Sequence, residues 1–506
     1  MDASGNISIP NGFEWQKRSD TLDTDENRED FEVLENVVID SVFKLKCPDL
    51  NVLCPNEAQN IPNVSKNAYE SNLNGLNEVE YGGFSRYVSN DEVILADIIR
   101  EDGTPPESAA FIRAGPREKL YFHPKKVIAG IVTCGGLCPG LNNVIREIVK
   151  TLYDIYDIEK VYGFRGGYGG IYGMKPLELS LDLVSDIHLK GGTILSSNRG
   201  GFDSEKILVK LKELGVNQLY LIGGDGTMRG ANALYKASLE ENKRSGYVLS
   251  VAGVPKTIDN DIDLVDRSFG FNTAVTEALH AVRSAKTEAM CAPNGIGVVK
   301  LMGRHAGFIA THACLASGDC DLCLIPEVPI ALTGPNSCLE HVARVVRKKG
   351  HAVVIVAEGA GEEILGQAQQ QDAGGNRKLP AIGYFMKQKI KEHLATLQID
   401  ATVKYIDPSY MIRSVKANAS DALFCLLLAQ NAVHAAMAGL TGFCVGLVNN
   451  RTVYIPMTAI VKNSPRQVNP KGRTFERVIT TTGQPRIHLS SRQQPMFKSL
   501  SSRVIV

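Results

Sequence analysis

Short apolar runs alternate with segments of helical periodicity from residue 125 onward, and this alternation constrains the fold more than any other feature. Six runs have the length of buried strands: 127–132, 218–222, 247–251, 296–301, 322–325 and 352–356. Between residues 272 and 289 the apolar positions recur at the spacing of one helix face. Strands that alternate with helices predict parallel-rich sheets, so the expected fold class is α/β.

The length of 506 residues exceeds what one hydrophobic core usually supports, so two domains and an extension are expected. Residues 1–95 are acidic and then rich in Asn, Ser and Pro, without sustained periodicity. We expect this extension to be partly disordered or wrapped on the core. The domains are expected at 96–270 and 271–460, with a tail at 461–506 and a chain that crosses between the domains more than once.

Composition excludes several classes of partner. The 55 basic and 55 acidic residues balance, so neither nucleic acid nor an anionic membrane is expected as a partner. No apolar run approaches the roughly 20 residues that span a bilayer.

Cys320 and Cys323 form the one CxxC pair, with no second pair or histidine beside it, so no zinc site is expected. An odd cysteine count without a secretory signal, and an acidic start unlike a transit peptide, predict a cytoplasmic protein.

The densest group of reactive side chains is Gly253-Val-Pro-Lys-Thr-Ile-Asp-Asn-Asp261. It follows an apolar run, and open α/β sheets bind ligands at the carboxyl ends of strands. In an extended segment Asp259 and Asp261 would point the same way, one to hold a cation and the other to accept a proton. Lys256 and Thr257 are placed to contact phosphate. A structural Asx-rich turn is the alternative, because Pro, Asn and Asp are ordinary turn residues.

A second motif, Gly223-Gly-Asp-Gly-Thr227, follows the run at 218–222. A strand, a glycine turn and a helix start direct backbone amides at an anion. NAD kinases and lipid kinases carry a similar motif, so this one alone does not identify a family.

Three more glycine-rich loops lie at 133–142, 163–170 and 191–201, and the last two each hold an arginine, Arg165 and Arg199. Guanidinium forks match phosphate oxygens. Together with Asp225 as a magnesium ligand and Asp259 as a base, these loops indicate a phosphoryl transferase. Two separate basic sets suggest that the acceptor also carries a phosphate, which favours a sugar phosphate.

Five motifs in register resemble 6-phosphofructokinases: GGDGT at 223–227, PKTIDND at 255–261, MGR at 302–304, AEG at 357–359 and YIDPSYMIR at 405–413. The PKTIDND motif and the long extension resemble the ATP-dependent enzymes of plants and kinetoplastid protists, which are close in sequence to pyrophosphate-dependent enzymes. The resemblance implies two Rossmann-like three-layer α/β/α domains of the phosphofructokinase type. Residues 96–270 would bind mainly nucleotide, and residues 271–460 mainly sugar phosphate.

The resemblance also implies the reaction and its setting. ATP, with Mg²⁺ as cofactor, would phosphorylate fructose 6-phosphate to fructose 1,6-bisphosphate in glycolysis. The family is allosteric, and its members are often homotetramers in which a neighbouring subunit completes the sugar-phosphate site.

Single residues take roles from the same resemblance. Asp259 would deprotonate the 1-hydroxyl of fructose 6-phosphate, with Thr257, Asp261 and Arg304 as further catalytic residues and Asp225 as the metal ligand. The residues expected at the sugar phosphate are Thr257, Asp259, Met302, Gly303, Arg304, Glu358, Lys404, Tyr410 and Arg413. Those expected at the nucleotide are Gly135, Gly136, Arg165, Arg199, Gly224, Asp225, Gly226, Thr227, Gly230 and Lys256.

Two positions bear on the phosphoryl donor. Pyrophosphate-dependent relatives tend to have Asp at the position of Gly226, where a side chain would fill space that the α-phosphate of ATP needs. Lys256 is shared with those relatives but is also kept by the plant-like ATP enzymes, so ATP is the expected donor. Ser196 departs from a usual family glycine. If that position has a positive φ, Ser196 would cost about 1 kcal/mol in backbone strain and weaken ATP binding.

Two alternatives remain beside an ATP-dependent enzyme. One is a pyrophosphate-dependent enzyme, which Gly226 disfavours. The other is a non-catalytic regulatory subunit, which the retained Asp225, Asp259 and Arg304 disfavour.

Overall fold

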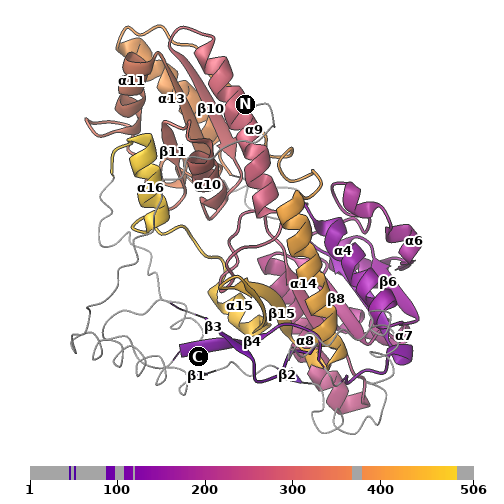
Figure 1. The fold of residues 1–506 in the computed structure, drawn as a ribbon. Helices are drawn as coiled ribbons and strands as arrows, with labels where there is room; N and C mark the ends of the chain where they lie inside the picture. Colours follow the sequence, from indigo (N-terminus) through magenta and orange to yellow (C-terminus); the bar gives the residue numbers. More distant parts are fainter. Residues whose placement is uncertain are drawn as a thin grey trace, which may run out of the picture.

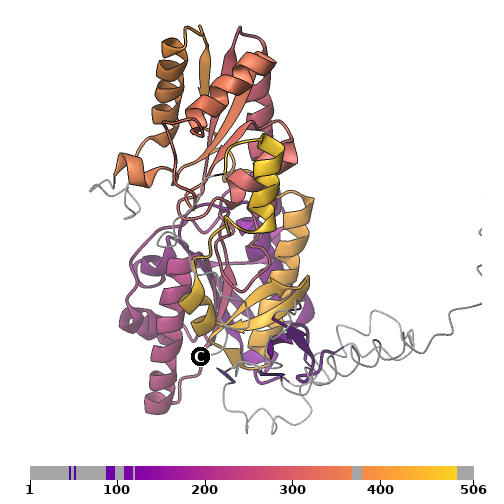
Figure 2. The ribbon, with the colours of Figure 1, turned by 90° about the vertical axis from the view of Figure 1, so that its left-hand side faces the viewer.

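The computed structural model describes residues 45–46, 51–52, 87–96, 98, 108–117, 120–366 and 379–486. Most of the expected extension at 1–95 and the end of the expected tail at 461–506 therefore lie outside the described residues. Two sheets, each covered by helices, form two units that lie one above the other in both views (Figures 1 and 2). This arrangement confirms the expected α/β class with two layered units.

The larger sheet has ten strands, of which β15, β9, β8, β5 and β6 run parallel. Strand β3 (Val93–Leu95) pairs with β4 off the main path. The order across the sheet is β1 (Leu45–Lys46), β4 (Ser108–Arg113), β16 (Arg451–Pro456), β15 (Phe443–Val448), β9 (Ser250–Pro255), β8 (Gln218–Gly223), β5 (Ile128–Thr133), β6 (Lys160–Phe164) and β7 (Leu177–Glu178).

Successive residues of the central strands point to opposite faces of this sheet, and helices cover both faces, so both sets of side chains are buried. On β8, Tyr220 and Ile222 pack toward α4 and α14, whereas Leu219 and Leu221 pack toward α7, α8 and α15. The helices of this unit are α4 (Leu141–Lys150), α5 (Gly167–Gly173), α6 (Leu181–Val184), α7 (Ser204–Glu213), α8 (Asp225–Ser245), α14 (Ala419–Met437) and α15 (Met457–Asn463). Short helical turns lie at η1 (Pro124–Lys126), η2 (Thr151–Ile155) and η3 (Ile187–Leu189).

The smaller sheet is entirely parallel, in the order β11 (Leu322–Leu324), β12 (His351–Ala357), β10 (Gly295–Leu301) and β13 (Val403–Ile406). One face packs on α9 (Phe271–Met290) and α10 (Phe308–Ser317), and the other on α11 (Cys338–Lys349) and α13 (Ile382–Thr396). Helix α16 (Arg473–Thr482) packs beside α10, and α12 (Glu362–Leu365) follows β12.

The chain returns to the larger sheet after β13. Helix α14 packs on α4, and β15 and β16 join the larger sheet; β14 (Leu440–Thr441) pairs with β2 (Asn51–Val52). The last part of residues 271–460 lies in the larger sheet, so the chain passes from one unit to the other, and the expected domain bounds stay a prediction. The domain functions stay a prediction.

One strand lies later in the sequence than its apolar run predicts. Strand β9 begins at Ser250, not Tyr247, because Gly246 ends α8 in a left-handed conformation and Tyr247 instead donates its hydroxyl to the Val216 carbonyl. Pro255 is thus the last strand residue, paired with Gly223. The loop with Asp259 starts directly at the end of the sheet.

Candidate active site

The motifs singled out in the sequence lie at the ends of strands of the two sheets, and backbone hydrogen bonds join their loops. The Lys256 N–H donates to the Gly223 carbonyl over 2.9 Å, which links the ends of β8 and β9. The Glu358 N–H donates to Leu301 over 2.9 Å, and the Gly359 N–H to Gly303 over 3.1 Å. The carboxyl ends of parallel strands meet at one edge of a sheet, so these contacts hold together the loops of each sheet. The charges of Glu358 and Arg304 act on Asp259, so the loops of the two sheets lie near each other.

Asp259 lies at the centre of this site. Burial raises the pKa of its carboxyl well above the usual range, and the negative charges of Asp261 and Glu358 raise it further, while Arg304 and Lys256 oppose the shift. Its Oδ1 is buried and accepts no hydrogen bond from the described residues. A carboxylate with a raised pKa and a free oxygen is suited to accept a proton.

The two aspartates of this loop are not related by strand alternation, as the sequence led us to expect. Asn260 between them has a φ of 56°, in the left-handed region, so the segment is not extended. Asp261 is instead close enough to raise the pKa of both Asp259 and Asp225. The expected pairing of the carboxylates is therefore wrong in its geometry, although the groups do lie near one another.

Asp225 begins α8, where no side chain caps the first amides. Burial raises the pKa of its carboxyl, and Asp261 adds to the shift, while Arg229 and His305 oppose it. Its Oδ1 is buried without a hydrogen-bond partner among the described residues, and its other oxygen pairs with Arg229. Mg²⁺ is usually held by one or two carboxylates together with substrate phosphates, so these oxygens fit that ion.

Two glycines of α8 have different surroundings. A Cβ added at Gly226 would meet no atom within 4 Å, so the space beside the helix start is open. A Cβ at Gly230 would lie 2.9 Å from the ring of Tyr168, whose hydroxyl donates to the Thr227 carbonyl over 2.7 Å. Gly226 thus leaves room for a ligand, whereas Gly230 accommodates a buried ring.

Lys256 holds the glycine-rich loop at 133–142 in place through a hydrogen bond. Its side chain is buried, and Nζ donates to the Gly136 carbonyl over 2.6 Å. Burial lowers the pKa of this amine. A Cβ added at Gly136 would lie 3.5 Å from Arg413 Nη1 and 3.7 Å from Arg199 Nη2. One arginine expected at the nucleotide and one expected at the sugar phosphate therefore converge over this loop.

The 191–201 loop contains the departure noted in the sequence. Ser196 has a φ of 53°, the positive value at which a side chain is strained. Its carbonyl accepts a hydrogen bond from the Thr133 hydroxyl over 2.7 Å, which holds the loop in place. Arg165 is exposed in the loop between β6 and α5, on the same unit.

Glu358 is surrounded by charged groups, some of which the sequence did not indicate. Burial raises the pKa of its carboxyl and Asp407 adds to this, while Arg304, Lys300 and Arg413 oppose it. Lys300 Nζ lies 2.8 Å from Asp407 Oδ2. The sequence could have indicated Lys300, because a lysine within the apolar run at 296–301 is expected to have a charged partner.

The remaining sugar-side residues are less closely gathered. Gly303 has a φ of 133°, and Met302 packs against the core beside it. Lys404 is exposed on β13, with Nζ 3.6 Å from a carboxylate oxygen of Glu288 at the far end of α9. Tyr410 is 76% exposed, with Arg413 stacked on its ring 4.9 Å from the centroid. The chain thus brings Arg413 to Glu358 but leaves Lys404 and Tyr410 at the surface.

Comparison with known proteins gives one consistent result. The family model described as Phosphofructokinase matches residues 128–436. ATP-dependent 6-phosphofructokinase 1 of Arabidopsis thaliana is 47% identical over 404 residues, covering 79% of this chain and 84% of the relative. The ATP-dependent 6-phosphofructokinase of Trypanosoma brucei brucei is 44% identical over 375 residues, covering 73% and 75%. Two further Arabidopsis relatives are named as chloroplastic.

The solved structures agree on the fold. A pyrophosphate-dependent phosphofructokinase from Nitrosospira multiformis has a TM-score of 0.57 and 20% identity, covering 69% of this chain and 88% of that one. At this identity the likeness concerns the fold alone.

Proposed function

The chain belongs to the phosphofructokinase family, and we propose that it transfers the γ-phosphoryl group of ATP to the 1-hydroxyl of fructose 6-phosphate. The observation that carries the proposal is the position of the buried Asp259, near Asp261, Glu358 and Arg304. The product would be fructose 1,6-bisphosphate, formed in glycolysis. The identity to plant and trypanosome relatives supports ATP as the donor.

The proposed mechanism uses Asp259 as the general base. Its carboxylate takes the proton of the 1-hydroxyl as the sugar oxygen forms a bond to the γ-phosphorus and the bond to the β,γ-bridging oxygen breaks. The raised pKa of Asp259 favours its protonated form as the proton arrives. Arg304, which opposes that shift, also supplies positive charge beside the transferred group.

Binding roles follow from the same geometry. Asp225 and Asp261 would hold Mg²⁺, which neutralises phosphate charge when bound. The amides that begin α8 and the loop of Gly135 and Gly136 would receive the nucleotide phosphates. Glu358 would accept hydrogen bonds from sugar hydroxyls, and Arg413 would bind the 6-phosphate together with Lys404 and Tyr410.

We also propose a homotetramer in which a neighbouring subunit completes the sugar-phosphate site. The exposure of Tyr410 (76%) and Met411 (69%) supports this, because two large apolar side chains lie at the surface beside Arg413. Light scattering on the purified protein gives the assembly. A cytoplasmic location stays a proposal too. Among the described residues we find no helix with the length and apolar character of a membrane span.

The test is product identification. Purified protein with MgATP and fructose 6-phosphate should give fructose 1,6-bisphosphate, and phosphorus NMR should show a new ester at the 1-position. Glucose 6-phosphate and fructose 1-phosphate serve as control acceptors and should be poor substrates. Absence of the bisphosphate with an intact fold and MgATP present would reject the proposal.

A further inference from the structure

The segment Ser464–Val468, which follows α15, contacts both loops of the proposed active site. Its residues lie more than 150 positions along the chain from those loops, and they bond almost only to backbone groups of the loops. Nothing in the motifs of the sequence pointed to this segment. The inference drawn from it rests on the proposed function.

Arg466 makes the densest set of these contacts. Its Nε donates to the Asn260 carbonyl over 2.8 Å, Nη1 to Val265 over 2.6 Å and Nη2 to Asp266 over 3.0 Å. Its backbone N–H donates to the Asp261 carbonyl over 2.7 Å. One arginine thus holds four carbonyls of the loop that carries Asp259.

The guanidinium is itself fixed in orientation. Its carbon lies 5.0 Å from the centroid of the Phe308 ring at the start of α10. A planar fork stacked on a ring can bond three carbonyls at once, which a lysine ammonium on its flexible stem cannot do with the same geometry. At position 466 the planar guanidinium is therefore as important for these hydrogen bonds as the positive charge.

The loop needs such support because its turn is unusual. Asn260 has a φ of 56°, and its Oδ1 accepts a hydrogen bond from the Ser268 N–H over 2.9 Å. The Ser268 hydroxyl donates to the Thr257 carbonyl over 2.7 Å. Arg466 binds the carbonyl of this left-handed residue, so it fixes the turn that directly follows Asp259.

The same segment reaches the opposite loop. Gln467 Nε2 donates to the His305 carbonyl over 3.2 Å, next to Arg304. The Val468 N–H donates over 2.7 Å to Glu327, whose carboxylate also accepts from the Gly307 N–H over 2.9 Å. Arg466 and Gln467, which are adjacent in this segment, therefore connect the loop of Asp259 after β9 with the loop of Arg304 after β10.

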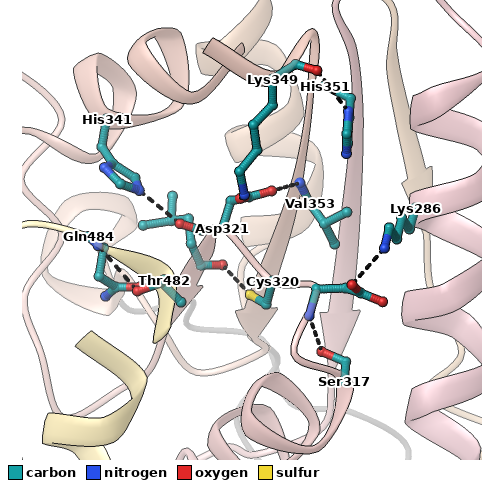
Figure 3. Close-up of polar contacts among 12 residues, drawn as sticks. Lys286, Ser317, Cys320, Asp321, His341, Lys349, His351, Val353, Thr482 and Gln484 are labelled. Atoms are coloured by element: carbon teal, nitrogen blue, oxygen red, sulfur yellow. Dashed lines mark hydrogen bonds and ion pairs between the residues drawn. The ribbon is translucent and has the colours of Figure 1, made fainter. Parts of the chain in front are cut away.

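The chain that continues from this segment through α16 is anchored at Gln484 to the edge of the smaller sheet. The Gln484 side chain pairs with the backbone of Cys323 on β11, accepting over 2.8 Å and donating over 3.1 Å. Figure 3 shows Gln484 with Thr482 beside the residues around Asp321, where β11 begins. The chain from Ser464 to Gln484 is thus fixed at both ends.

We propose that Arg466 is a positioning residue for phosphoryl transfer, which holds the Asp259 loop in register with the Arg304 loop. It does not touch the reacting atoms. Losing its fork should leave both substrates bound but misplace the base, and small displacements of reacting groups reduce the rate strongly. The effect should therefore fall on kcat and not on KM.

Arg117 provides a matched control within the chain. It donates to the carbonyls of Gly115 over 3.2 Å and Arg113 over 2.7 Å, and it stacks 5.6 Å from the ring centroid of Tyr454. Tyr454 contacts Asn431, which at 1.5 Å per residue lies roughly 20 Å along α14 from the helix start near the site. The two arginines have similar bonding, but only Arg466 reaches an active-site loop.

The experiment compares Arg466→Lys with Arg117→Lys in the full-length protein. We expect kcat of Arg466→Lys to fall about 10- to 100-fold with both KM values within about threefold, and kcat of Arg117→Lys to stay within about twofold. Both should lose similar thermal stability. Methylguanidinium should restore kcat of Arg466→Ala several-fold and leave Arg117→Ala unchanged.

Three results would overturn the inference: kcat of Arg466→Lys within twofold of wild type, an equal fall in both Lys variants, or no recovery with methylguanidinium. If the Arg466 variants do not fold, Ser464→Ala tests whether the hold of the same segment on the Asp259 loop affects the rate. The Ser464 hydroxyl accepts from the Asp263 N–H over 3.0 Å, and its loss should lower kcat about threefold; an unchanged kcat would contradict the inference. Wild-type protein without fructose 1,6-bisphosphate formation would instead reject the proposed function.

Discussion

The proposed nucleotide side and the proposed sugar side of the site are built in different ways. The nucleotide side consists mainly of backbone: the start of α8, the Gly136 carbonyl held by Lys256, and the open space at Gly226. The proposed sugar side consists of side chains from separate loops: Arg413 is near enough to Glu358 to oppose the rise of its pKa, while Tyr410 stays exposed. The comparison teaches that folding of the backbone shapes the proposed nucleotide side, whereas the proposed sugar side depends on the placement of long side chains.

The largest expected effect lies where the two sides meet. Asp259→Asn removes the base but keeps the size of the side chain, so kcat should fall about 10³-fold. Titration calorimetry should show that MgATP and fructose 6-phosphate still bind. Asp319→Asn, which disturbs an ion pair with Lys286 in the smaller unit, is the control and should keep kcat within about twofold. Substantial turnover by Asp259→Asn would place the base elsewhere.

A change at Gly226 tests the nucleotide side. Gly226→Asp fills the open space beside the helix start, so kcat/KM for ATP should fall about 100-fold while the melting temperature stays close to wild type. Gly230→Ala is the contrasting variant, because its methyl group would meet the Tyr168 ring at 2.9 Å and lower stability instead. Equal ATP kinetics in wild type and Gly226→Asp would show that this space does not receive the nucleotide.

A change at Arg413 tests the sugar side. Arg413→Ala should raise KM for fructose 6-phosphate about 30-fold and leave KM for ATP within about twofold, since the loss of one charged contact to a phosphate costs about 2 kcal/mol. Arg347→Ala, an exposed arginine on α11 with only a 4.0 Å ion pair to Glu340, is the control. A comparable rise in KM for ATP would mean that Arg413, which lies near Arg199 over Gly136, serves both substrates.

The smallest expected effect concerns backbone strain in the nucleotide side. Ser196→Gly should relieve the positive φ of 53° and raise stability by up to about 1 kcal/mol, with KM for ATP a few-fold lower. Asn294→Gly, at a φ of 48° before β10, should gain less, because asparagine tolerates this conformation. Thermal melts and ATP kinetics of both variants measure the difference. A higher KM for ATP in Ser196→Gly would contradict the strain argument.

The sequence predicted local features of this site well, because each motif directly follows an apolar strand. The loops after β8, β9, β10 and β12 could be placed from the apolar runs alone. These inferences need only neighbouring residues. Because the carboxyl ends of parallel strands meet at one edge of a sheet, the loops that follow them are expected to lie close together.

Longer-range features could not be predicted in this way. The contact of Arg466 with Asn260 joins residues 206 positions apart, and no periodicity encodes it. The left-handed φ of Asn260 changed the relation of Asp259 to Asp261, and the start of β9 shifted because Gly246 ends α8. Tertiary contacts decide such points, so they appear only once the chain is folded.

The most direct test of the account is the ratio of kcat/KM for ATP to kcat/KM for pyrophosphate, measured on one preparation with fructose 6-phosphate and Mg²⁺. The open space at Gly226 predicts a preference for ATP of at least about 100-fold. Equal or faster turnover with pyrophosphate would contradict the assignment of the nucleotide side. No turnover with either donor would contradict the proposed reaction.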